Sequence, residues 1–156
     1  MSQGIRSALS KLDIMIEGAT PKTDIDHGFV SINSRAGSVN LIDNTPFNTR
    51  FFDIRTSSFA QDGGLSGLSS NKTGFFEVVV RYDIPNNLQD RLLIMAEDAS
   101  EISNTIKGPD YDLINTGIIN CIVDTSPRLE SLLDNLGDEV ASLLIIPFTM
   151  IYLEEA

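Results

Sequence analysis

Side chains that could act as a nucleophile, a general base or a metal ligand are scarce in this chain, which holds one histidine, His27, and one cysteine, Cys121. Asp26 precedes His27, and a carboxylate next to an imidazole suggests a catalytic pair. Adjacent residues do not face one another, however, and no nucleophile motif accompanies them, so we interpret His27 as a histidine in a surface loop. Cys121 falls within a predicted strand, where we expect a buried and unreactive thiol. With one residue of each kind, a transition-metal site built from Cys and His is not expected either.

Two short motifs resemble known binding loops without completing them. Asp24 and Asp26 start like a calcium-binding loop, but His27 takes the third acidic position and no glutamate closes the loop. Residues 71–73, Asn-Lys-Thr, follow a glycine-rich stretch as in a phosphate-binding loop, but the required glycines are missing and a strand follows instead of a helix. The same triplet is a glycosylation sequon, which has meaning only in a secreted protein. We therefore expect no cofactor.

Three carboxylates, Glu97, Asp98 and Glu101, lie close together on a predicted helix. Paired carboxylates perform acid–base chemistry only in a pocket that shifts their pKa values. A solvent-exposed helix face is the simpler interpretation, and we expect all three to lie there. The residues therefore give no support for an enzyme.

The composition indicates one domain spanning residues 1–156, because 42% of the residues are hydrophobic and the length is typical of a single core. The formal net charge is −11, and so acidic a surface repels phosphate, which argues against sequence-specific nucleic-acid binding. Residues 1–6 lack the apolar run of a signal peptide. The longest apolar run, residues 143–146, is too short to cross a bilayer, so we expect no membrane partner.

The stretch at residues 74–108 predicts a strand that turns at Pro85 into a long helix. Residues 74–84 alternate apolar and mixed positions, as in a strand with one buried face, and Pro85 ends the strand because it has no N–H to donate. Asn86 or Asn87 can cap the helix, and Lys107-Gly108 is a stop signal. The predicted buried stripe of this helix consists of Leu88, Leu92, Met95, Ala99, Ile102 and Ile106.

Other elements surround this unit. Residues 2–17 predict a helix capped by Ser2, with Asp13 on its exposed face, which we expect beside the central helix on the same face of the sheet. Residues 29–32 and 39–42 predict a short hairpin, and residues 47–56 and 115–123 predict strands. The predicted fold class is therefore α+β, a single domain with a mainly antiparallel sheet and with the N-terminal and central helices on one face.

Two apolar groups could belong to the core or to an interface. Residues 57–73 are rich in Gly and Ser, so we expect the mobile tip of an antiparallel hairpin, in which Phe59, Leu65 and Leu68 would gain from burial against a partner. Ser126 and Pro127 predict the start of a short helix that ends at Gly137. Its apolar stripe either closes the core or docks on another subunit. The stripe consists of Leu129, Leu132, Leu133 and Leu136.

Residues 140–154 predict a last strand that is apolar on both faces, as a central strand would be. Pro147 within it favours a bulge or an edge position, and one edge could then receive a neighbouring subunit.

The order of these elements resembles the tail terminator, or tail completion, proteins of long-tailed bacteriophages. The stretches that carry the resemblance are residues 50–54, 76–82, 116–119 and 145–154, with a glycine-rich tip and a leucine-bearing loop between them. The resemblance covers almost the whole chain as a pattern of elements.

The resemblance implies a non-enzymatic α+β subunit in the phage virion, assembled in the host cytoplasm as a homo-oligomeric ring of six. Such a ring stops polymerisation of the tail tube and presents a face to the head–tail connector protein. An acidic lumen would let DNA pass without specific binding. The alternatives are a head–tail joining or minor tail protein of similar fold and, in another class, a small acidic hydrolase using Asp26 and His27.

Overall fold

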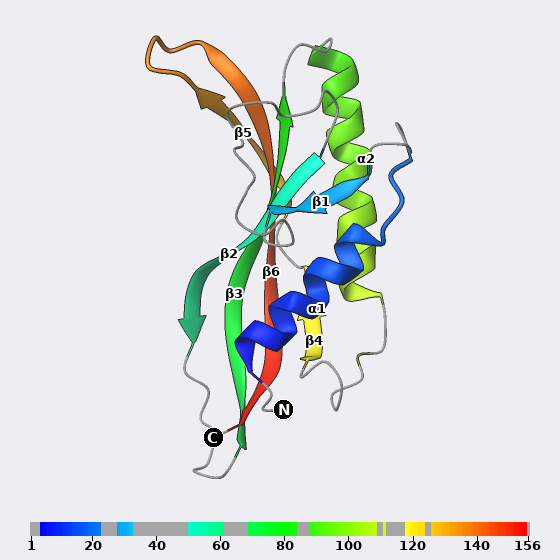
Figure 1. The fold of residues 1–156 in the computed structure, drawn as a ribbon, viewed down its shortest axis with the longest axis vertical. Helices are drawn as coiled ribbons and strands as arrows, with labels where there is room; N and C mark the ends of the chain where they lie inside the picture. Colours follow the sequence, from blue (N-terminus) through cyan, green and yellow to red (C-terminus); the bar gives the residue numbers. More distant parts are fainter. Residues whose placement is uncertain are drawn as a thin grey trace.

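The structure is a computed structural model that describes residues 4–22, 28–32, 50–60, 69–83, 88–108, 111, 118–123 and 126–155. Within these residues, each of two helices is followed by three strands. In chain order they are α1 (Ile5–Glu17), β1 (Phe29–Ser31), β2 (Arg50–Ala60), β3 (Ser69–Asp83), α2 (Leu88–Lys107), β4 (Ile118–Ile122), β5 (Arg128–Leu133) and β6 (Glu139–Glu155). Figure 1 shows them as a tall sheet with both helices on one side.

The sheet has the order β1-β2-β3-β6-β4, and β5 pairs with β6 beyond the end of β4. β1 runs parallel to β2, and the other pairs are antiparallel. The longest ladder joins β3 to β6 from the Ser69–Glu155 pair to the Asp83–Ala141 pair. The architecture is therefore the predicted α+β class, a mixed but mostly antiparallel sheet in one domain.

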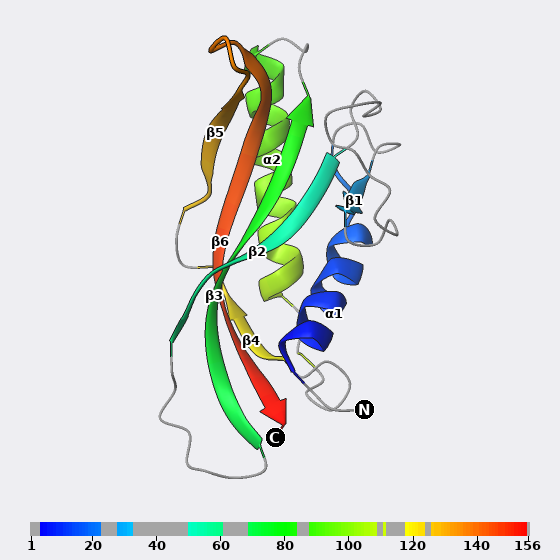
Figure 2. The same cartoon turned by 60° about the vertical axis from the view of Figure 1, so that its left-hand side comes forward.

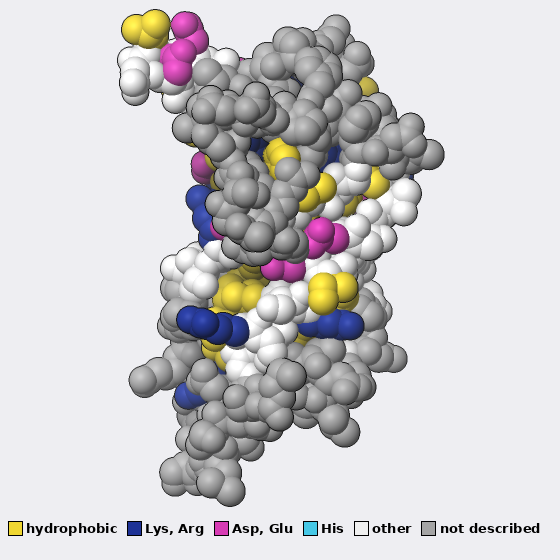
Figure 3. Space-filling view, in the orientation of Figure 1, with side chains coloured by type: hydrophobic (Ala, Val, Ile, Leu, Met, Phe, Trp, Pro, Cys, Tyr) yellow, Lys and Arg dark blue, Asp and Glu magenta, His cyan; other side chains and the backbone are white. Residues whose placement is uncertain are grey.

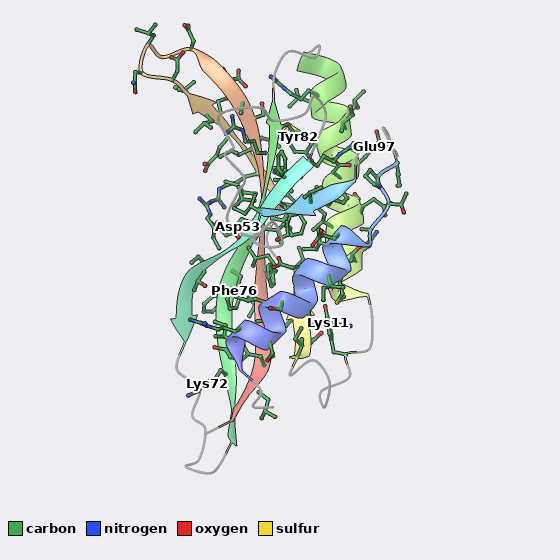
Figure 4. All side chains as sticks on the ribbon, viewed as in Figure 1. Lys11, Asp53, Lys72, Phe76, Tyr82 and Glu97 are labelled. Carbon is green, nitrogen blue, oxygen red and sulfur yellow. The ribbon has the colours of Figure 1, made fainter. Side chains whose placement is uncertain are left out.

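The core lies between the sheet and the two helices, which cover the same face as predicted (Figure 2). The alternation in β3 is confirmed, because Phe76, Val78, Val80 and Tyr82 are all buried. The ring of Phe76 stacks on that of Phe148 in β6, with the ring centroids 5.6 Å apart. These β3 side chains point toward the helices, as the labelled Phe76 and Tyr82 show in Figure 4. From α1, the core receives Ala8, Leu12 and Ile16.

The helices differ from the sequence-based predictions at a few positions. Along α2, Met95, Ala99, Ile102 and Ile106 are buried as expected, but Leu92 is 41% exposed. The proposed caps, Ser2 for α1 and Asn86 or Asn87 for α2, lie outside the described residues, and so does Pro85.

The strands reach further into the glycine- and serine-rich stretch than predicted. β2 continues to Ala60, where it pairs with Thr73 of β3, and β3 begins at Ser69, where it pairs with Glu155 of β6. The prediction that all of residues 57–73 form the tip of the hairpin is therefore wrong at both ends, because residues 57–60 and 69–73 belong to its strands. Residues 61–68, with Leu65 and Leu68, lie outside the described residues, and Phe59 is described only by its backbone, which pairs with Gly74.

The first strand, β1, pairs with a different segment from the one predicted. β1 pairs in parallel with β2, with Phe29 opposite Arg50 and Ser31 opposite Phe52. Residues 39–42, expected to be its hairpin partner, and residues 47–49 lie outside the described part of the chain.

The predicted helix over residues 126–137 is wrong, because this stretch forms β5 and a turn. β5 pairs with β6 from the Arg128–Ile145 pair to the Leu133–Glu139 pair, and this pairing overrides the helix-like spacing of the leucines. Pro127 stands just before the strand, where it removes no ladder hydrogen bond. The turn is fixed by Asp134, whose Oδ1 accepts hydrogen bonds from the backbone N–H groups of Leu136 (2.8 Å) and Asp138 (2.9 Å). Gly137 completes the turn with φ of 84°, a conformation that favours glycine.

β6 is a central strand, as its two apolar faces predict, and Pro147 lies at a local gap along one of its edges. One edge of β6 pairs with β3 throughout, and the other pairs with β5 as far as Ile145 and with β4 from Thr149 onward. Pro147 falls in the interval between these two partners, so its missing N–H costs no hydrogen bond there. One strand can therefore serve two different neighbours on the same edge.

Candidate docking surface

The clearest exposed apolar surface in the described residues is the leucine hairpin, which comprises β5, the turn at residues 134–138 and the start of β6. It projects from the upper left of the molecule in Figure 1. Every described side chain of residues 128–139 is exposed. The exposed fractions are 49% for Leu129, 36% for Leu132, 56% for Leu133 and 86% for Leu136. The interpretation that these leucines close the core is therefore wrong.

Two polar anchors hold the base of the leucine hairpin. On the sheet face away from the helices, Glu77 of β3 bridges two arginines, accepting from Arg128 of β5 at 2.7 Å and from Arg55 of β2 at 3.2 Å. On the other side, Arg91 of α2 donates to Glu139 at 3.3 Å, and the hydroxyl of Ser142 donates to the same carboxylate at 3.0 Å. The base of the hairpin is therefore tied to both layers of the fold, while the leucines remain free.

A groove of about 430 Å³ lies where the leucine hairpin meets α2. Its apolar lining comes from both layers: Leu92, Met95 and Ala99 of α2, Leu129 of β5 and Leu144 of β6. Its polar lining comes from the next turns of α2 and consists of Ser100, Ser103, Asn104 and Lys107. The exposure of Leu92, which the sequence placed in the core, is explained by its position in this groove. We call this feature the α2–β5 groove.

The turn of the leucine hairpin joins an apolar side chain to acidic ones. Leu136 is the most exposed large hydrophobic residue among those described, and it stands between Asp134 and Asp138. Figure 3 shows hydrophobic and acidic atoms together at the end of this projection. Such a tip suits a partner surface that is apolar at its centre and basic at its rim.

A buried polar cluster lies elsewhere, inside the core. Asp98 is fully buried, and its Oδ2 accepts from Arg50 Nε at 2.6 Å and from the Tyr82 hydroxyl at 2.7 Å. Burial raises the pKa of Asp98, and the hydrogen bond from Tyr82 and the charge of Arg50 oppose that rise. The prediction that Asp98 lies on a solvent-exposed face is wrong. The cluster links β2, β3 and α2 and does not line the α2–β5 groove, so we assign it a structural role.

A second perturbed carboxyl is Asp13 of α1, which the sequence placed on an exposed face. It is half-buried, and its Oδ1 has no hydrogen-bond partner within the described residues. Burial, with the charges of Asp53 and Glu17, raises the pKa of Asp13 to about 6, although a hydrogen bond with Ser31 works in the other direction. Asp13 is therefore a carboxyl that titrates near neutral pH.

The remaining chemical candidates give no site. Cys121 is buried, as predicted, and burial raises its pKa to about 11, which disfavours the reactive thiolate. Asp24, Asp26 and His27 lie outside the described residues, and Lys72 lies within β3. Over the described ranges, no group of three or more His, Cys, Asp or Glu is placed to hold a metal ion. Neither α1 nor α2 is long and apolar enough to cross a membrane.

Comparison with known proteins adds no relative: no protein-family model matches the chain, and no curated protein matches it significantly. The leucine hairpin and the α2–β5 groove are therefore the features on which a functional proposal must rest. The four leucines were recognised from the sequence, but the groove residues Leu92 and Lys107 were not. The adjacent pair Leu92-Leu93 could have indicated an exposed apolar position on α2, since one buried stripe of a helix does not need two neighbouring leucines.

Proposed function

We propose that this chain is a structural protein of a long-tailed bacteriophage, a tail terminator that assembles as a homo-oligomeric ring of six at the head-proximal end of the tail tube. The ring would stop polymerisation of the tube and join the tail to the head–tail connector protein. The sequence pattern supports this proposal through its resemblance to tail terminator proteins. The α+β fold is consistent with it.

The observation that carries the proposal is the leucine hairpin. Four leucines stand exposed on a projection whose base is anchored by ion pairs to both layers of the fold. Isolated exposed leucines are common, but several gathered on one projecting element mark a surface that gains free energy when a partner covers it. A subunit whose work is docking needs such a surface and needs no catalytic group.

The net charge of −11 fits a ring through which DNA passes. A negatively charged lumen forms no tight contacts with the negatively charged phosphates of DNA, so the duplex would pass through without binding. The tail tube protein and the connector protein are the expected partners.

Sedimentation velocity over a concentration series, alone and with the tail tube protein of the same virus, tests the proposal. We expect a discrete oligomer, and in the presence of tubes we expect the protein at tube ends, seen by electron microscopy as capped tubes of limited length. A monomer under all these conditions would contradict the proposal.

A head–tail joining or minor tail protein of similar fold is the second candidate, because the leucine hairpin would serve it equally well. Pull-down against the connector and tube proteins separately distinguishes the two. A terminator should retain both partners, whereas a protein that joins only to the connector should not cap tubes.

A further inference from the structure

We infer that the turn of the leucine hairpin in one copy of this chain inserts Leu136 into the α2–β5 groove of the next copy. The inference rests on the proposed ring and names the contact that builds it. Three observations lead to it: the charges of the two surfaces, the chemistry of the groove, and the distance between tip and groove within one molecule.

The charges of the two surfaces are complementary. The tip carries Asp134 and Asp138, while the only charged side chain in the described lining of the groove is Lys107. Lys107 is exposed at the last turn of α2. In a chain of net charge −11, most pairs of surfaces from two copies would repel each other. A basic rim that faces an acidic tip avoids this repulsion and fixes the orientation of the contact.

The chemistry of the groove suits a leucine flanked by a polar turn. Its volume of about 430 Å³ falls in the range of roughly 300–1,000 Å³ found for binding pockets. Leu92, Met95 and Leu144 supply an apolar floor for the Leu136 side chain. Ser100 and Asn104, on the polar side, offer hydrogen-bond partners to the turn backbone that flanks Leu136.

The tip cannot fill the groove of its own molecule. Leu129, at the base of the hairpin, lines the groove, and β5 then leads away from it. The four residue steps from Leu129 to Leu133 alone span roughly 13 Å at about 3.3 Å per residue. Figure 1 shows the tip well apart from α2. A hairpin tip that occupies the groove must therefore belong to another copy.

A tip that enters a groove is a contact between two different surfaces. Such head-to-tail contacts close into a ring when the rotation between copies is right, and otherwise they continue as a filament. The contact is thus of the kind that a ring of more than two subunits needs.

Directed disulfide formation between two cysteine variants tests the contact. Leu136→Cys places a thiol on the tip, and Ala96→Cys places one at an exposed position lining the groove. We expect a covalent dimer when the two variants are mixed under mild oxidation. Leu93→Cys, at a 58% exposed position of α2 outside the groove lining, is the matched control and should give no such dimer with Leu136→Cys. The native Cys121 is buried and should not take part.

A charge exchange provides an independent test. Lys107→Glu and Asp138→Lys should each weaken self-association about two- to fivefold, as for an exposed ion pair. The chain carrying both changes should recover the wild-type association constant, because tip and rim are then complementary again. Asp138 is chosen because Asp134 fixes the turn.

The outcomes separate this contact from the proposed function. Two outcomes would overturn the contact and leave the proposed ring intact. One is a ring that forms while the Leu136→Cys and Ala96→Cys variants give no crosslink, and the other is crosslinking of Leu136→Cys only to itself. A crosslinked oligomer that never caps tail tubes would overturn the tail function and leave the contact. A chain that stays monomeric at all concentrations would overturn both.

Discussion

Arg50 and Asp98 form an ion pair inside the core, with Arg50 Nε donating to Asp98 Oδ2 over 2.6 Å. Both side chains are almost completely buried, and the pair ties β2 to the middle of α2. The guanidinium of Arg50 also lies over the ring of Phe29, 5.8 Å from its centroid. A buried ion pair therefore fastens α2, the helix that lines the groove, to strand β2 of the sheet.

Asp98→Ala should destabilise the fold by about 3–5 kcal/mol, because it removes the buried carboxylate that offsets the charge of Arg50. Replacing the buried cluster together, as Arg50→Met, Asp98→Leu and Tyr82→Phe, should cost much less, since it removes both charges and the Tyr82 hydroxyl that donates to Asp98. Urea unfolding of the two variants measures both values. A loss below about 1 kcal/mol for Asp98→Ala would show that water reaches Arg50 after all.

Leu132→Asp should abolish assembly and leave the monomer folded. Leu132 is 36% exposed on β5, so the change should alter the free energy of unfolding by no more than about 1 kcal/mol. Sedimentation and thermal unfolding measure the two effects. Leu12→Ala is the matched control from the core, where the same kind of loss should cost about 2–5 kcal/mol and leave the docking surface intact. If Leu132→Asp unfolds the chain, the leucine hairpin is part of the core.

Gly74→Ala should destabilise the fold by about 1–3 kcal/mol through overpacking. A Cβ at this position would lie 2.5 Å from Cε2 of the Phe76 ring and 3.5 Å from Tyr152 Cε1. Gly28→Ala meets no atom within 4 Å and should be close to neutral, which makes it the control. Thermal unfolding of both variants gives the comparison. The double variant Gly74→Ala with Phe76→Leu should lose less stability than the sum of the losses in the two single variants, because the smaller side chain at position 76 relieves the clash.

Asp13→Asn should change how stability depends on pH. A carboxyl whose pKa is raised by folding, here from 3.8 to about 6, binds its proton more tightly in the folded state. Its contribution to stability is therefore full below pH 3.8, falls as the pH rises to about 6, and stays low above that. The variant has no carboxyl at this position to lose its proton. The difference in melting temperature between the variant and the wild type should therefore shift in favour of the variant as the pH rises from 3.8 to about 6. A constant difference between the two proteins from pH 3.5 to 8 would contradict the assignment, and NMR titration of the Asp13 carboxyl checks its pKa directly.

The sequence was sufficient to predict the central elements because their periodicity is strong. Phe76, Val78, Val80 and Tyr82 occupy four successive alternate positions, and Met95, Ala99 and Ile102 follow one helical stripe, so both elements and their packing could be predicted. The predicted strand and helix therefore required no tertiary information.

The leucine hairpin could not be predicted as a strand because its spacing is misleading. Leu129, Leu132, Leu133 and Leu136 stand three, one and three residues apart, which is typical of a helix, yet the available edge of β6 draws the chain into a strand. Asp98 posed a different problem: its burial depends on Arg50, which lies 48 residues earlier, and no local pattern reports such a partner. The groove likewise arises only when α2 and β5 come together in space.

The β3–β6 ladder sets how the molecule would bear a mechanical load. Every residue of the 15-residue β3 pairs with β6, and the leucine hairpin continues directly from the upper end of that ladder. A pull on β6 along the axis of the ladder would act parallel to these strands, so it would shear all their inter-strand hydrogen bonds at once instead of peeling them apart one by one. β6, which leads out of the turn of the leucine hairpin, is therefore also the strand through which tension on the docking surface would reach the longest ladder of the sheet.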